Sequence, residues 1–304
     1  STILNKFKSK FLINMKLLIP LSFFALLALV GCDIVKDPVI PSGSGQIDTT
    51  CTEVIPLFTT RRALLEDFSG FRCNNCPAAS EVAQGLLDTY NEEVVVVGIH
   101  VLASFAAPVP PLDDAFFDTD FRTDAGNTYA QDLQISFLPV GAVSRKDYSG
   151  SQLLSDGAWG AAVSEIIGQP ADMDVQLACF SYNATTNTVN VTARVIALND
   201  VVGDHNLVMY LTEDHIIDWQ IDAREDEPNI PDYEHRHVLR GNLNGAYGDP
   251  VITGTLAAGD TTSLSFAYTL PPNVLQPNNC ALVAYVANSA TKEVMQVVKR
   301  KFVQ

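Results

Sequence analysis

The spacing of apolar residues changes near residue 170, and this change divides the chain into two regions. In the first region, Arg62–Phe68 and Val94–Ile99 are short apolar runs typical of buried strands. Between them, apolar residues recur at helical spacing: Ala79, Val82, Ala83, Leu86, Leu87 and Tyr90. A later helical stripe, closed by Gly168 and Pro170, contains Trp159, Ala162, Val163, Ile166 and Ile167. We therefore predict an α/β domain built on a βαβ unit over residues 54–170.

From residue 171 onward the apolar residues alternate with polar or smaller ones, which is the period of β-strands. The alternating runs are Val175–Cys179, Val189–Val195, Leu207–Leu211, Leu264–Tyr268, Cys280–Val286 and Val294–Val298. Turns rich in Asn, Gly and Pro separate them. Roughly seven short strands in a segment of this length are typical of an antiparallel immunoglobulin-like sandwich. We predict such an all-β domain for residues 171–304.

Cys73 and Cys76 form a C-x-x-C motif at the turn between the first strand and the helix. Inside a βαβ pattern this placement is the thioredoxin-type redox signature. Unpaired N–H groups at a helix N-terminus stabilise a thiolate, so we expect Cys73 to be the exposed, attacking thiol and Cys76 the resolving one. Pro139 stands at the entrance of a later strand, where thioredoxin folds place a cis-proline that faces the disulfide. We predict a cis bond before it.

Other interpretations of these cysteines remain open. No Trp precedes Cys73, and Phe71-Arg72 occupies that position, a departure that fits a permanent structural disulfide. A zinc site is disfavoured, because no second C-x-x-C accompanies the first. Thioredoxin-like enzymes also hold a buried acid behind the disulfide, and Glu66 or Asp67 lies in the corresponding strand. Strand alternation predicts that one of these two side chains points inward and that the other is solvated.

The N-terminus indicates where the protein is located. Lys16 precedes the apolar run Leu17–Val30, which is short for a membrane span and ends at Gly31-Cys32. This is the pattern of a secretory signal with a lipobox, so we predict a signal peptide over residues 1–31 and lipidation of Cys32. The alternative is an uncleaved membrane anchor. Residues 32–53, rich in Pro, Gly, Ser and Thr, are predicted to be a flexible tether between the lipid and the folded body.

The net charge of the chain indicates which classes of partner it can bind. The chain has 19 basic and 35 acidic residues. Loss of the predicted signal peptide removes four lysines and no acids, which leaves 15 basic residues and a net charge of −20. Nucleic-acid binding is excluded, because contact with phosphates needs a basic face. The membrane, reached through the lipid, and envelope proteins that carry thiols or disulfides are the expected partners.

Three further features have less specific signals. Cys51, Cys179 and Cys280 remain after the motif and the lipid site are assigned, and we expect a Cys179–Cys280 disulfide, although Cys51 could replace either partner. His235 and His237 could lie on one strand face, but a metal site needs more ligands than these two supply. We expect no metal and no cofactor. The insertion 104–131, rich in Pro and Asp, is expected to be a solvated loop.

Two longer segments resemble a known family. They are Leu65–Pro77, which contains the C-x-x-C, and Tyr233–Gly241 followed by Asn244–Gly248. Together with the lipobox and the β-rich second half, they resemble the 28-kDa outer-membrane-protein-related family of Bacteroidota lipoproteins. The resemblance implies an outer-membrane lipoprotein, periplasmic or surface-exposed, with a thioredoxin-like and an immunoglobulin-like domain. It implies no settled activity, and adhesion has been suggested for the family.

These observations lead to two alternative functions. The first is thiol–disulfide exchange on envelope proteins through Cys73 and Cys76, with Pro139 shaping the substrate groove. The second is surface binding or adhesion, in which the thioredoxin fold is a scaffold and the Cys73–Cys76 bond is structural.

Overall fold

The computed structural model describes residues 51–109 and 116–303. The predicted signal peptide, Cys32 and most of the predicted tether therefore lie outside the described residues. Within residues 51–109 and 116–303, no helix is both long enough and apolar enough to cross a membrane.

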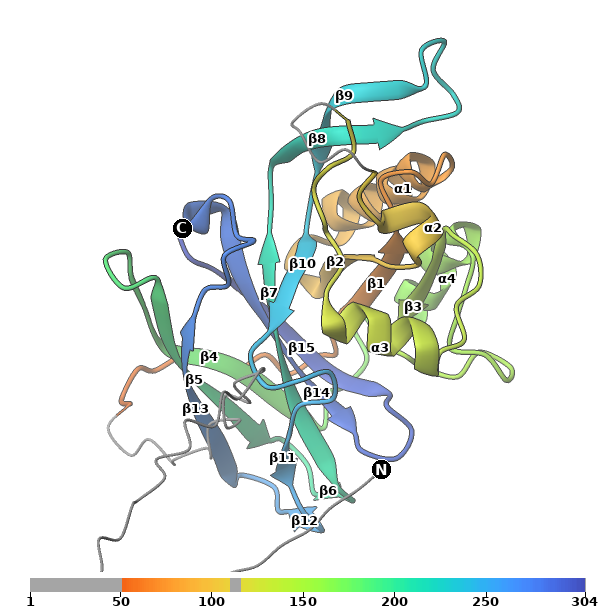
Figure 1. The fold of residues 1–304 in the computed structure, drawn as a ribbon. Helices are drawn as coiled ribbons and strands as arrows, with labels where there is room; N and C mark the ends of the chain where they lie inside the picture. The colour runs from red at the N-terminus through yellow and green to blue at the C-terminus, as the bar shows by residue number, and fades with distance from the viewer. Residues whose placement is uncertain (1–50, 110–115, 304) are drawn as a thin grey trace, which may run out of the picture. The chain divides into compact units, whose positions relative to one another are not determined.

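The first half of the described chain forms a small α/β unit (Figure 1). Strand β1 (Ala63–Ser69) pairs in parallel with β2 (Val94–His100) and antiparallel with β3 (Val140–Val143). The helices are α1 (Cys76–Tyr90), α2 (Ala103–Ala106), α3 (Asp124–Asp132) and α4 (Asp156–Ile166), and a short 3₁₀ helix spans Asn91–Glu93. The two helices and two strands predicted from apolar spacing are thus confirmed.

Helices α1 and α4 cover one face of the sheet in this unit. Alternate residues of β1 and β2, such as Leu65 and Val96, contact Ala79 of α1 and Trp159 of α4 in one apolar cluster. Trp159 lies so close to β3 that a Cβ on Gly141 would come within 2.6 Å of its ring. Apolar residues at helical spacing therefore form the stripes with which both helices cover the sheet.

The second half is almost entirely β-structure. Its strands are β4 (Met173–Asn183), β5 (Thr188–Ala197), β6 (Val201–Val202), β7 (His205–Glu213), β8 (Ile216–Ile221), β9 (Asn229–His235), β10 (Val238–Asn242), β11 (Asp249–Ile252), β12 (Thr255–Leu256), β13 (Thr261–Thr269), β14 (Cys280–Asn288) and β15 (Val294–Lys301), with a 3₁₀ turn at Pro277–Asn279. Strands β13, β5 and β4 form a three-stranded sheet. It shares an apolar core with β7 and β14, to which Val191, Val195, Met209, Leu211 and Leu282 contribute.

The two halves share one sheet and one core. The large sheet runs β15-β14-β7-β10-β2-β1-β3, and it crosses between the halves where Val238 pairs with Gly98 (Figure 1). On the face opposite α1, Leu64 and Val97 belong to the same cluster as Tyr210 and Tyr285 of the second half. The change of sequence pattern at residue 170 therefore separates two kinds of structure that are packed as one body.

The segment from Tyr233 to Gly248, which carries the family resemblance, connects these parts. Asn244 accepts a hydrogen bond from the Met209 N–H (3.0 Å) and donates one to the Leu207 carbonyl (2.8 Å). Tyr247 donates to Asp132 at the end of α3 (2.6 Å). These contacts fasten α3 to β7, which gives the segment a structural role.

The insertion 104–131 is more structured than predicted. Its described residues contain most of α2 and of α3. The Thr123 hydroxyl accepts a hydrogen bond from the Gly126 N–H (3.0 Å) and caps α3. Thr123 followed by Asp124 is a helix-start signal that the acidic composition of the segment obscured.

The disulfide prediction for the second half was wrong. Cys51 is bonded to Cys179, and Cys280 is a buried free thiol. A β-bulge after Ala178 shifts the alternation of β4, so Cys179 leaves the inward face on which Cys280 lies. Residues 51–53, predicted to belong to the tether, lie instead along the sheet, because Arg194 donates to the carbonyl oxygens of Cys51 and Glu53 (2.5 and 2.6 Å).

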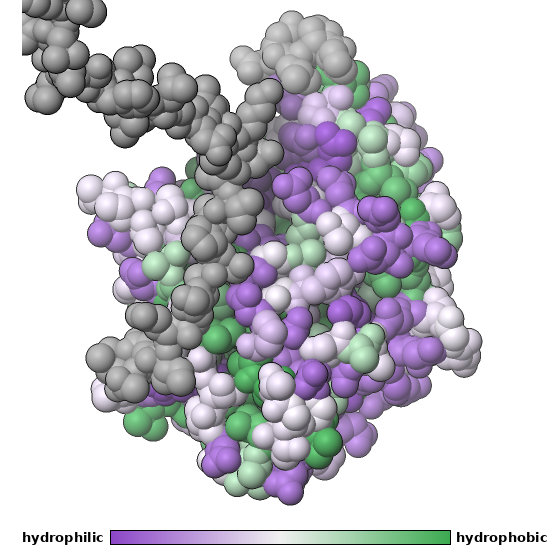
Figure 2. All heavy atoms as spheres, turned by 60° about the horizontal axis from the view of Figure 1, so that its bottom comes forward, coloured by the Kyte–Doolittle hydropathy of each residue, from purple (hydrophilic) through white to green (hydrophobic). Residues whose placement is uncertain are grey.

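The surface is mixed in character. In Figure 2, apolar residues on the visible face are scattered among polar ones. Isolated apolar residues of this kind are ordinary on protein surfaces and indicate no docking site by themselves.

Candidate functional site

The Cys73–Cys76 pair is a disulfide at the start of α1. The Cys73 N–H donates to the Gly70 carbonyl (2.9 Å) and the Cys76 N–H to the Cys73 carbonyl (3.2 Å), so the motif is two successive tight turns. Pro77 needs no N–H donor in the first helical turn, and the preceding Asn75 makes no side-chain cap. The partial positive charge of the helix end is therefore left uncapped next to the sulfur atoms.

Pro139 lies at the same end of the sheet. The Leu138–Pro139 peptide is cis, as predicted from sequence. It precedes Val140, which pairs with Phe68 near the end of β1, and Leu138 belongs to the same apolar cluster as both cysteines. The two cysteines and the residue before Pro139 therefore belong to one apolar cluster.

The prediction that Cys73 is the exposed cysteine was wrong. The side chains of Cys73 and Cys76 are each only 1% exposed. On one side, the Arg72 N–H donates to the Phe105 carbonyl of α2 (3.0 Å). On the other, the β8–β9 hairpin donates hydrogen bonds to the carbonyl oxygens of the motif turn. Neither neighbour could be foreseen from the sequence, because both are distant from the motif along the chain.

Both carboxylates of β1 are buried, which contradicts the expectation that one of them is solvated. Glu66 faces the core shared by the two halves, where Arg145 donates to both of its oxygens (2.7 Å each). Asp67 faces α1 and accepts one hydrogen bond from the Ser80 hydroxyl (3.1 Å), while its Oδ1 has no partner. Strand alternation is correct here, but β1 is central, so both of its faces are covered.

Burial changes the acidity of Asp67. Because no cation compensates its charge, desolvation raises its pKa to about 7. An acid with a pKa near neutrality can both release and accept a proton at physiological pH. Asp67 is therefore a buried acid of the βα unit that is suited to proton transfer.

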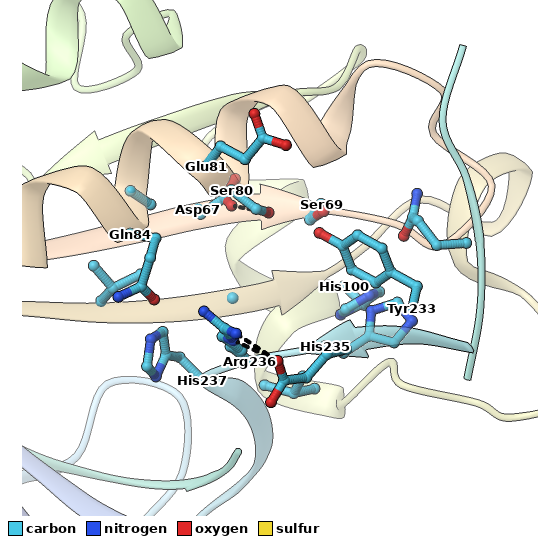
Figure 3. A pocket seen from close by; sticks show the side chains of 16 residues that line it. Asp67, Ser69, Ser80, Glu81, Gln84, His100, Tyr233, His235, Arg236 and His237 are labelled. Atoms are coloured by element: carbon cyan, nitrogen blue, oxygen red, sulfur yellow. Dashed lines mark hydrogen bonds and ion pairs between the residues drawn. The ribbon is translucent and has the colours of Figure 1, made fainter. Parts of the chain in front are cut away.

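A polar pocket of about 270 Å³ adjoins Asp67 (Figure 3). Its lining includes Ser69, Ser80, His100 and Tyr233, which come from β1, α1, β2 and β9. His100 is buried, neither ring nitrogen has a partner, and its pKa lies well below the ordinary value because of desolvation. Sequence reasoning could not identify this pocket, since no local pattern links the four elements.

His235 and His237 do not share a strand face. Strand β9 ends at His235, whose Nε2 contacts the Trp219 carbonyl (3.1 Å), and His237 follows with a positive φ of 55° and pairs with Asp214 (2.6 Å). Desolvation lowers the pKa of His235 to about 4, so the buried imidazole is neutral at pH 7. Within residues 51–109 and 116–303, no three His, Cys, Asp or Glu side chains form a group that could hold a metal ion.

We expect Asp67→Asn to stabilise the protein at pH 8 and to have little effect at pH 4. The folded-state pKa of about 7 lies above the ordinary value of 3.8, so stability from this group is greatest at low pH and falls as pH rises through 4 to 7. Asn removes this loss, which is about 4 kcal/mol for a pKa shift of this size once the pH exceeds 7. Urea unfolding at the two pH values measures the difference, and an equal effect at both would contradict the assignment.

Comparison with known proteins identifies the family. The family model described as outer membrane protein Omp28 matches residues 126–304, which is more than half of the chain. The chain belongs to the Omp28 family. This confirms the resemblance inferred from the sequence and associates the chain with the outer membrane. The matched region contains Pro139 and the family segment but not the Cys73–Cys76 motif.

The fold is similar to that of a solved structure. HBP35 of Porphyromonas gingivalis is similar in structure with a TM-score of 0.59 and 17% identity, over 81% of this chain and 76% of that one. A domain of the outer membrane lipoprotein Omp28 from Porphyromonas gingivalis matches 44% of this chain and 89% of its own length, with 20% identity and a TM-score of 0.30. No curated protein matches the sequence. At these identities the likeness to HBP35 shows a shared fold and nothing about activity.

Proposed function

We propose that this member of the Omp28 family carries out thiol–disulfide exchange on envelope proteins through Cys73 and Cys76. The observation that carries this proposal is the position of the disulfide. It lies at an uncapped helix N-terminus and in one cluster with the residue before a cis-proline, and the buried acid Asp67 lies on β1 of the same βα unit. Each of these features has a chemical use in exchange, and a disulfide that serves only as a staple needs none of them.

The proposal includes a fold assignment for each half. The parallel β1–α1–β2 unit, antiparallel β3 and α4 support a thioredoxin-like fold for residues 54–170. The antiparallel sheet of β13, β5 and β4, packed against β7 and β14, supports an immunoglobulin-like sandwich for residues 171–304. We also propose that Cys32 carries the lipid and that the envelope is where substrates are met.

The reaction proceeds in two displacements. In the reduced protein, the Cys73 thiolate attacks one sulfur of a substrate disulfide, forms a mixed disulfide and releases the other substrate sulfur as a thiolate. Asp67 takes the proton of the Cys76 thiol, and the resulting thiolate attacks the sulfur of Cys73. The second substrate thiol leaves, so the substrate is reduced and the Cys73–Cys76 pair is oxidised by two electrons. An oxidised pair performs the same steps in reverse on a substrate dithiol.

One observation favours a second function. Because both cysteines are only 1% exposed, the disulfide is also suited to holding the start of α1 in place. In that case the protein is a surface binding or adhesion protein in which no thiol exchange takes place.

The reduction potential of the Cys73–Cys76 pair tests the proposal. The purified chain is equilibrated with glutathione buffers, and the redox state of each cysteine is read by alkylation and peptide mass spectrometry, which separates this pair from Cys51–Cys179. We expect a value in the range of known exchange proteins, roughly −120 to −270 mV. A value below about −300 mV would instead assign the bond a structural role.

A further inference from the structure

The β8–β9 hairpin lies across the motif turn. We call residues Ile216–His235, which comprise β8, β9 and their connection, the strap. The Ile221 N–H donates to the Phe71 carbonyl (2.8 Å), the Gln220 amide to the Cys73 carbonyl (3.1 Å) and the Ala223 N–H to the Asn74 carbonyl (3.0 Å). Three carbonyl oxygens within the turn are thus satisfied by one distant segment.

This arrangement is incompatible with exchange on a protein substrate. The attacking thiolate must reach a sulfur atom of the disulfide, so the rate depends on access. With both cysteine side chains 1% exposed, a polypeptide cannot make that approach. We propose that the strap is an autoinhibitory cover, which must lift from the motif turn before Cys73–Cys76 reacts with a protein. This inference rests on the proposed exchange function, since it describes the regulation of the same site.

The strap is built as a separable element. Strands β8 and β9 pair only with each other among the described strands, and an isolated two-stranded hairpin is marginally stable. Its two connections to the large sheet pass through His215 and His237, which both have positive φ (60° and 55°). By contrast, α2, the other neighbour of the motif, follows the end of β2 after only two residues. The strap is therefore the side of the site that can move.

The contacts that hold the strap are of two kinds. Near its base, Trp219 and Ile221 pack against the cluster containing Phe71 and Phe117. Near its tip, Arg224 forms an exposed ion pair with Glu81 of α1 (2.7 Å). Within the strap itself, Arg224 also pairs with the buried Asp222 (2.6 Å). The exposed pair with Glu81 can exchange for water at little cost, so it is suited to reversible release.

The pocket of Figure 3 lies under the second strand of the strap. Ser80 and Gln84 of α1 form one wall, and Tyr233 and His235 of β9 form the other. The strap therefore meets α1 across a polar cavity in place of close apolar packing. Lifting it from α1 exposes less apolar surface than separating two packed elements would, which lowers the cost of opening.

The test measures reduction of Cys73–Cys76 in the full chain by tris(2-carboxyethyl)phosphine at rising concentrations. If opening must come first, the rate reaches a plateau set by the opening rate. Arg224→Ala removes the ion pair that joins the strap to Glu81 of α1, and Gln220→Met removes the amide that contacts Cys73 at similar volume. We expect each to raise the plateau by about fivefold. Lys146→Ala, which removes an exposed ion pair with Glu165 away from the strap, is the matched control and should equal the native rate.

The inference would be overturned if the reduction rate rose in proportion to the reductant at every concentration and was equal in the native protein and the three variants. The reduction potential separates the two proposals, because it is an equilibrium property and does not depend on the rate of opening. If the reduction rate reaches a plateau but the reduction potential lies below about −300 mV, the strap acts as a cover but the exchange function is contradicted. If the reduction potential lies in the exchange range but the reduction rate shows no plateau, the exchange function is supported and the strap is not a cover.

Discussion

Arg145→Met is expected to lower the free energy of unfolding by about 3–5 kcal/mol, because it leaves the carboxylate of Glu66 buried without a cation. Both side chains are almost fully buried, and the Arg145 guanidinium donates to both Glu66 oxygens. Burial alone would lower the pKa of Arg145, but the charge of Glu66 raises it well above its ordinary value. Arg145 also lies over the ring of Tyr129, 4.3 Å from its centroid.

The size of this effect comes from the position of the pair. Tyr210 of the second half donates to Glu66 (2.8 Å) and lies 2.8 Å from the hydroxyl of Tyr285. The pair therefore lies where the two halves share their core, and its loss weakens the contact between them. A buried polar network of this kind destabilises the protein when some of its groups lose their hydrogen-bond partners.

Urea unfolding followed by far-ultraviolet circular dichroism measures the loss. Lys146→Ala breaks the neighbouring exposed pair with Glu165 and should change stability by less than about 1 kcal/mol. The double variant Arg145→Met with Glu66→Gln should be more stable than Arg145→Met alone, because no buried charge remains. Equal stability of Arg145→Met and Lys146→Ala would show that the pair is not buried as described.

Replacing Cys51 and Cys179 together by Ser is expected to cost about 2–5 kcal/mol in unfolding free energy. The bond joins residues separated by 128 positions, and a cross-link across so long a loop strongly restricts the unfolded chain. The bond also secures residues 51–53, where Glu53 pairs with Arg300 (3.2 Å). Without it, we expect this segment to detach from the sheet.

The Cys73→Ser, Cys76→Ser double variant is the matched control, since that bond closes a loop between residues only three positions apart and restricts the unfolded chain much less. Thermal unfolding should therefore show a larger loss for the Cys51, Cys179 variant. Peptide mapping of the oxidised native chain must also find Cys280 as the free thiol. A Cys179–Cys280 peptide would contradict this assignment.

The local pattern of the sequence was sufficient for the elements and for part of the site. Helical spacing around Leu86 and Trp159 predicted α1 and α4, because residues at that spacing lie on one face of a helix. The motif at Cys73 and the proline at 139 predicted the disulfide turn and the cis bond, since both depend on residues adjacent in the chain. Period-two alternation likewise predicted the β-rich second half.

What the sequence did not reveal depends on neighbours distant along the chain. A single inserted residue in β4 reversed the side to which Cys179 points, so its disulfide partner could not be inferred from alternation. Glu66 and Asp67 were expected to differ in exposure, but β1 is covered on both faces.

By itself, then, the sequence determined the family, the two kinds of secondary structure and the position of the C-x-x-C motif, since each is encoded in consecutive residues. The tertiary structure alone decided that the halves share one sheet, that Asp67 adjoins a polar pocket, and that the strap covers Cys73 and Cys76. The physical reason is that burial and contact are set by which surfaces meet in space. Those meetings depend on the packing of the whole chain.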